Sequence, residues 1–134
     1  MLRISEGSAH KLGLIDINTY AGCTCCYVML GSRCDKGCLF CSQSIDGSTL
    51  SRISWPKFDA ERIIECINKS SFERACLQCT SAGISHVKTV AHRIKIPVSI
   101  SFNFNDLEEV AELAPFADKV CIPLDAAAEH IYSK

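Results

Sequence analysis

The sequence lacks the features that mark several large classes of protein. No apolar run reaches the roughly 18 residues that a membrane-spanning helix needs, and residues 1–11 mix charges with single apolar side chains rather than forming a signal-peptide core. Charge of one sign is also missing, because 14 Lys and Arg stand against 15 Asp and Glu, for a net charge of -1. We therefore predict a cytoplasmic protein with no membrane segment. A nucleic-acid binder that works by bulk positive charge is excluded.

Cysteine, in contrast, is abundant, with 10 among 134 residues. In a reducing cytoplasm thiols stay reduced, so clustered cysteines indicate metal binding or catalysis rather than disulfides. The densest group is Cys34-Asp-Lys-Gly-Cys38-Leu-Phe-Cys41, a C-x3-C-x2-C run. Thiolates bind iron–sulfur clusters, zinc and copper(I). Three thiolates in one short loop could hold three irons of a four-iron cluster and leave the fourth iron open to another ligand.

The second half of the chain alternates between short apolar segments and amphipathic helical patterns. We expect strands over 26–30, 73–79, 98–102 and 118–123. We expect helices over 60–68 with Asp59 as N-cap, over 85–94, after a cap at Asn105, and from Asp125 or Ala126 onward. The helix after Asn105 should bury an apolar stripe of Leu107, Val110, Ala111 and Ala114. This alternation predicts an α/β fold with about four parallel β/α units joined by right-handed crossovers.

The cysteine run resembles the signature of the radical S-adenosylmethionine (SAM) superfamily, including the aromatic Phe40 directly before the last cysteine. The wider sequence resembles the biotin synthase-like branch of that superfamily, in which Cys41-Ser-Gln-Ser matches a C-x-Q continuation. Segments similar to archaeal-type lipoyl synthase components are Tyr27-Val-Met-Leu-Gly, Leu50-Ser-Arg-Ile-Ser-Trp-Pro and Ala75-Cys-Leu-Gln. The resemblance covers most of the chain, and only the N-terminal half of such a protein.

This resemblance implies that residues 1–134 are the N-terminal part of a single radical SAM domain. An N-terminal extension over 1–24 would precede a partial (β/α) barrel over 25–134, because the chain is too short for a complete eight-unit barrel of about 200 residues or more. The barrel would carry its cofactors at the C-terminal mouth.

The resemblance also implies a set of site residues. Cys34, Cys38 and Cys41 would ligate a [4Fe-4S] cluster whose open iron is chelated by SAM. The remaining contacts to SAM would come from Phe40 at the adenine, Thr80 and Ser81 at the amino group, and Asp125 at the ribose.

The activity implied is that of a radical SAM enzyme. It would cleave SAM reductively to abstract a hydrogen atom from an unactivated carbon, in sulfur insertion of the lipoyl or biotin synthase type or in cofactor biosynthesis. We expect a small-molecule or protein-bound substrate and an electron donor such as ferredoxin or flavodoxin. A half-barrel leaves open sheet edges and an uncovered apolar face, so we also expect a partner chain that completes the sheet.

Two other interpretations stay open. Cys23-x2-Cys26 and Cys38-x2-Cys41 form two C-x-x-C pairs, a pattern similar to a zinc ribbon. The chain could also be an inactive, truncated fragment.

The other cysteines have a structural and a functional interpretation. We expect burial as small hydrophobic residues for Cys66, Cys76, Cys79 and Cys121. An auxiliary cluster, of the kind that biotin synthase holds near the position of Cys76, could instead draw on Cys23, Cys25, Cys26 and Cys76. Val98 occupies the next ligand position of that second cluster, so we do not predict it.

Overall fold

The structure is a computed structural model, and it describes residues 1–18, 22–31, 49–50, 53–80, 82–102 and 107–122. Its elements are, in chain order, β1 (Leu2–Ile4), α1 (Glu6–Lys11), β2 (Cys25–Leu30), β3 (Thr49–Leu50), β4 (Ile53–Ser54), β5 (Lys57–Phe58), α2 (Ala60–Lys69), β6 (Arg74–Cys79), α3 (Ile84–Arg93), β7 (Val98–Ser101), α4 (Leu107–Leu113), the 3₁₀ helix η2 (Ala114–Phe116) and β8 (Lys119–Cys121).

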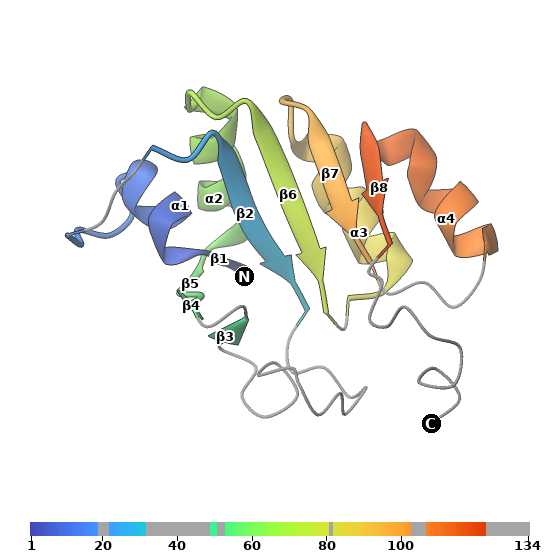
Figure 1. The fold of residues 1–134 in the computed structure, drawn as a ribbon, viewed down its shortest axis with the longest axis horizontal. Helices are drawn as coiled ribbons and strands as arrows, with labels where there is room; N and C mark the ends of the chain where they lie inside the picture. Colours follow the sequence, from blue (N-terminus) through green and yellow to red (C-terminus); the bar gives the residue numbers. More distant parts are fainter. Residues whose placement is uncertain (19–21, 32–48, 51–52, 81, 103–106, 123–134) are drawn as a thin grey trace, which may run out of the picture.

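Four strands form the parallel part of the sheet, in the order β2-β6-β7-β8 in which they occur along the chain. Helices α2, α3 and α4 occur between successive strands of this set, and Figure 1 shows α2 and α3 on one side of the sheet, behind the strands. The α/β class predicted from the alternating pattern is therefore confirmed. A helix lies in each connection that returns the chain to start the next parallel strand.

The sheet is mixed rather than purely parallel. Strand β1 pairs antiparallel with β2, and β5 pairs antiparallel with β1, so the six-stranded sheet has the order β5-β1-β2-β6-β7-β8. Leu2 and Ile4 are buried and alternate with the half-buried Arg3, as a strand with one covered face requires. Part of the segment 1–24 thus belongs to the sheet. A strand of three residues, such as β1, is too short to be recognised from a periodic pattern in the sequence.

The helices begin where the sequence offers a cap. The Asp59 carboxylate accepts a hydrogen bond from the Arg62 N–H at 3.1 Å, which confirms it as the N-cap of α2. Ile63, Ile64 and Ile67 form the buried face of that helix, as their spacing predicts. The expectation for α4 is wrong: Leu107 is 80% exposed, and the buried residue of this helix is Leu113. Helix α4 has only seven residues and runs directly into η2, so only its end reaches the core.

Alternation along the strands gives the sheet two different faces. The helix-covered face carries the apolar core, including Val28, Leu30, Leu77 and Ile100. We call the opposite one the open face. It is defined by the strand residues in register on that side: Arg3, Lys57, Cys25, Tyr27, Met29, Arg74, Cys76, Gln78, Ser99, Ser101, Lys119 and Cys121. This face is more polar than the apolar surface that we expected, and it is the side of the sheet turned toward the viewer in Figure 1.

Among the described residues, none of the helices combines the length and the hydrophobicity that crossing a membrane would require.

Candidate functional site

The carboxyl ends of the four parallel strands lie at one edge of the sheet. Leu30, the last residue of β2, is in register with Cys79, the last residue of β6. Ser101 and Cys121, the last residues of β7 and β8, are likewise in register with each other. Parallel α/β proteins place their ligand sites outside this edge, because the loops that leave it converge there. We therefore take this edge as the candidate site.

Two residues shape the edge where β2 and β6 end. Gly31, which follows β2, has a φ of 98°, in the left-handed region that favours glycine, so the chain turns sharply as it leaves the strand. Thr80, which follows β6, donates hydrogen bonds to the Leu30 carbonyl oxygen from both its backbone N–H at 3.0 Å and its Oγ1 hydroxyl at 3.1 Å. The ends of these two neighbouring strands are thus tied together.

Of the residues predicted for the site, the structure describes Thr80 alone, and it lies at the carboxyl edge as expected. The other predicted contacts lie outside the described residues: Cys34, Cys38, Cys41, Phe40, Ser81 and Asp125. Asn105, expected as a helix cap, and the helix expected from Asp125 or Ala126 also lie outside them. In the sequence, the cysteine run begins just past Gly31, directly after β2.

Cysteines also lie on the open face, below the edge. Cys25 on β2 and Cys76 on β6 share that face and lie close enough for Cys25 to affect the titration of Cys76. Burial, and after it the proximity of Cys25, raise the pKa of the Cys76 thiol to about 11, although the Arg74 guanidinium acts in the opposite direction. Burial also raises the pKa of Tyr27, which is in register with Cys76. With their pKa values raised, the Cys76 thiol and the Tyr27 phenol stay neutral near pH 7.

The other described cysteines differ in their surroundings. Cys26 is fully buried in the core, and this burial raises the pKa of its thiol to about 12. Burial raises the pKa of Cys79 to about 12 as well, and this residue packs against the core as we expected. Cys66 is half-buried. The prediction that Cys121 is buried is wrong, because it lies exposed on β8 at the end of the sheet.

The part of the chain that the structure describes contains no group of three or more His, Cys, Asp and Glu side chains arranged to hold a metal ion. Cys23, Cys25, Cys26 and Cys76 all belong to that part.

Sequence reasoning missed a polar row across the open face. Arg74, Ser99 and Lys119 lie on the neighbouring strands β6, β7 and β8. The Arg74 guanidinium donates to Ser99 Oγ at 3.1 Å, and Ser99 is in register with Lys119. Each of these residues alternates with an apolar neighbour, Ala75, Ile100 or Val120. That alternation is the signal that could have assigned them to one face.

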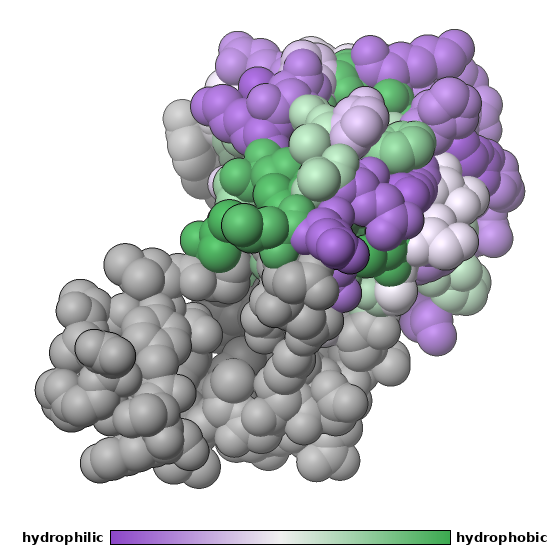
Figure 2. Space-filling view, turned by 90° about the vertical axis from the view of Figure 1, so that its right-hand side faces the viewer, coloured by the Kyte–Doolittle hydropathy of each residue, from purple (hydrophilic) through white to green (hydrophobic). Residues whose placement is uncertain are grey.

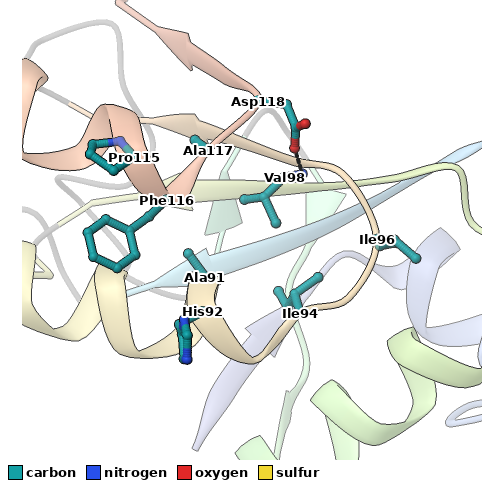
Figure 3. Close-up of a pocket in the computed structure, with 9 residues that line it drawn as sticks. All are labelled: Ala91, His92, Ile94, Ile96, Val98, Pro115, Phe116, Ala117 and Asp118. Atoms are coloured by element: carbon teal, nitrogen blue, oxygen red, sulfur yellow. Dashed lines mark hydrogen bonds between the residues drawn. The ribbon is translucent and has the colours of Figure 1, made fainter.

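A hollow lies at the amino ends of the strands, where Val98 begins β7 and Asp118 precedes β8 (Figure 3). It encloses about 330 Å³, and apolar side chains such as Ala91, Ile94 and Phe116 line much of it. Its one carboxylate, Asp118, already accepts a hydrogen bond from the Val98 N–H at 2.8 Å. Because this hollow is at the edge opposite Thr80, we do not assign the candidate site to it.

Comparisons of the chain with protein-family models, curated proteins and solved structures give no significant match.

Proposed function

We propose that the protein is a radical SAM enzyme that holds a [4Fe-4S] cluster and SAM at the carboxyl edge of its parallel strands. The observation that carries the proposal is the position of the C-x3-C-x2-C run, which directly follows β2 in a sheet whose parallel strands all end at one edge. Cys34 is the fourth residue after Leu30, so the chain length keeps the first cysteine within about 14 Å of the strand end.

The donor set suits the cluster. Three thiolates are the ligands that iron–sulfur clusters require, and an open iron leaves room for the amine and carboxylate of SAM. When bound, the cluster supplies the electron that cleaves SAM, and the reaction removes a hydrogen atom from an unactivated carbon. The task of this chain is to bind and orient SAM and substrate and to exclude water.

Thr80 is the described residue best placed to orient SAM. Its hydroxyl donates its hydrogen to the Leu30 carbonyl oxygen, so toward any other group Oγ1 acts as an acceptor. An acceptor at this edge suits the ammonium group of SAM. The same bond to β2 fixes the Thr80 side chain in one orientation before the ligand binds. Binding therefore loses less side-chain conformational entropy.

The finer architecture that we propose is a partial (β/α) barrel. Support comes from the parallel strands, which follow chain order without a reversal, as the strands of a barrel do. Strand β8 is the last strand at that end of the described sheet. Figure 2, a view onto the side of β8 and α4, shows hydrophobic residues gathered next to hydrophilic ones, and Ile122 just after β8 is 63% exposed. We propose that further β/α units or a partner chain cover this edge.

The zinc-ribbon interpretation is less well supported. It requires Cys26 to give a thiolate ligand, and Cys26 is fully buried in the helix-covered core with a pKa raised to about 12. For zinc to bind at Cys26, the surrounding core residues would have to move apart. This rearrangement costs free energy, whereas a zinc ribbon at the protein surface has no such cost.

The test is anaerobic reconstitution of the full chain with iron and sulfide. We expect a brown protein with about four irons per chain, a reduced electron paramagnetic resonance signal that SAM changes, and release of methionine and 5'-deoxyadenosine on reduction. Cys34→Ala, Cys38→Ala and Cys41→Ala should each abolish the iron signal. The matched control is Cys66→Ala, which removes a half-buried thiol from α2 and should keep it.

A colourless protein with stoichiometric zinc would overturn the proposal, as would a cluster that survives each of the three substitutions. A cluster that forms but leaves SAM intact under reduction would retain the metal centre and refute the reaction.

A further inference from the structure

Among the strand residues that the structure describes, the open face of the sheet carries cations and no carboxylates. Across the strands of the main sheet, the open-face residues include Arg3, Lys57, Arg74 and Lys119 and contain no Asp or Glu. The ion pairs of the described residues all lie on the helices or between them, at Lys69–Glu65, Lys88–Glu112 and Arg93–Glu61. The acidic partners in these three ion pairs thus lie on the helices, whereas the open-face strand positions carry cations alone.

Two of these cations, Arg74 and Lys119, flank Ser99 on the strands to either side of it. The Arg74 guanidinium donates to Ser99 Oγ at 3.1 Å, and Lys119 is directly opposite Ser99 on the adjacent strand. The Ser99 residue is only 6% exposed. Since its oxygen accepts the bond from Arg74, its own O–H is left to donate to another acceptor. The Arg74 guanidinium thus contacts the Ser99 hydroxyl, and Lys119 is the cross-strand neighbour of Ser99 on the other side.

We infer that Arg74, Ser99 and Lys119 bind the anionic group, a carboxylate or a phosphate, of a substrate that lies along the open face. Three donors, two of them charged, are the groups that hold such oxygens with the strongest hydrogen bonds. That this anion belongs to the reacting substrate depends on the proposed function; the anion site itself does not.

The neighbours of this site do not oppose an anion. Cys76 is in register with Ser99, and Tyr27 is in register with Cys76. Their pKa values are raised, that of Cys76 to about 11, so both side chains are neutral near pH 7. They offer a thiol and a phenol beside the anion in place of two negative charges.

The position within the strand also limits the shape of the substrate. Ser99 lies two residues before Ser101, so the anion would sit about 7 Å from the carboxyl edge. A group that reacts at that edge must therefore be joined to the anion by a chain of several atoms. The substrate class is a molecule whose carboxylate or phosphate lies several atoms from the group that reacts.

Binding of three probes by the full chain tests this inference. Hexanoate, hexyl phosphate and hexanol share one alkyl chain and differ in the head group, and calorimetry measures their dissociation constants before and after reconstitution with iron and sulfide. We expect both anions to bind at least about tenfold more tightly than hexanol, with an affinity that falls as salt is added. The tighter of the two anions identifies the head group.

Matched variants locate the site. R74Q and K119Q should each weaken binding of the anions about tenfold or more and leave that of hexanol unchanged. R62Q on α2 and K95Q before β7 remove the same charges from exposed positions and should change nothing. S99A should weaken the anions by a smaller factor. Circular dichroism of each variant checks that it folds, and K119Q replaces an exposed side chain.

Equal binding of hexanol and the anions would overturn the inference, as would anion binding that K119Q and K95Q reduce to the same degree. Anion binding before reconstitution that depends on Arg74 and Lys119 sustains the anion site even when SAM cleavage fails. The absence of anion binding in a protein that cleaves SAM overturns it and leaves the proposed function standing.

Discussion

Thr80 donates two hydrogen bonds to a single acceptor, the carbonyl oxygen of Leu30. One comes from its backbone N–H at 3.0 Å and the other from its Oγ1 hydroxyl at 3.1 Å. The pair joins the residue after β6 to the last residue of β2, the strand that leads into the cysteine run.

Thr80→Val should separate the two bonds. Valine keeps the shape and the backbone bond and loses the hydroxyl, so we expect the free energy of unfolding to fall by about 1 kcal/mol in a urea titration. Thr80→Ser keeps the hydroxyl and should lose less than Thr80→Val. An equal loss in both variants would show that the methyl group, and not the hydroxyl, matters here.

A second prediction concerns stability at high pH. Burial raises the pKa of Cys79 from its ordinary 9.0 to about 12. Between these values the unfolded chain loses the thiol proton while the folded chain retains it, so stability falls as the pH rises through 9. The contribution of Cys79 to that fall should be about 1 kcal/mol between pH 9 and pH 10.

Urea titrations of the wild type and Cys79→Ala at pH 8, 9 and 10 measure this contribution. Cys79→Ala should be less stable than the wild type at pH 8, and its stability should fall less steeply as the pH rises. Part of the fall should remain, because the buried Cys26 thiol titrates in the same direction. Cys66→Ala removes a thiol from α2 and is the control. Parallel slopes in the wild type and Cys79→Ala would contradict the burial of the thiol as the cause.

Much of the sheet could be predicted from the sequence, because its parallel strands are separated by helices of regular period. The strands at 74–79 and 98–101 and the helix capped by Asp59 lie within a residue or so of the expected positions. In each of them an apolar pattern is long enough to distinguish a helix from a strand. Strands β1 and β5 have three and two residues and present no such pattern, so their antiparallel pairing could not be predicted from the sequence.

The polar row on the open face could not be recognised from the spacing of its residues in the sequence. Arg74, Ser99 and Lys119 are far apart in the chain, and each looks like an ordinary polar residue of a strand end. Only the register of β6, β7 and β8 brings them together. The cysteine run is the reverse case, since its ligands are adjacent in the sequence and can be recognised without any tertiary contact.

Substitution of two leucines that differ in burial tests which side chains belong to the core. Leu77 on β6 is fully buried on the helix-covered face, whereas Leu107 on α4 is 80% exposed. Leu77→Ala should cost about 2–5 kcal/mol of unfolding free energy, because it removes buried methyl groups and leaves a cavity. Leu107→Ala should change stability by no more than about 0.5 kcal/mol. Similar losses in the two variants would mean that Leu107 is covered in solution, as a partner chain seated on this side would cause.

Gly31 and Gly7 provide the last prediction, because alanine should act with opposite sign at the two sites. Gly31 has a φ of 98°, a conformation in which a Cβ is strained, so Gly31→Ala should lower the unfolding free energy by about 1–2 kcal/mol. Gly7 lies within helix α1, and a Cβ built there meets nothing within 4 Å. Gly7→Ala should therefore raise stability by about 0.5–1 kcal/mol, since alanine restricts the unfolded chain and favours the helix. Thermal and urea unfolding of the two variants measure both changes. Were Gly31→Ala neutral, the backbone after β2 would be free to relax out of the left-handed conformation. The sharp turn from the strand into the cysteine run would then not be fixed by this residue.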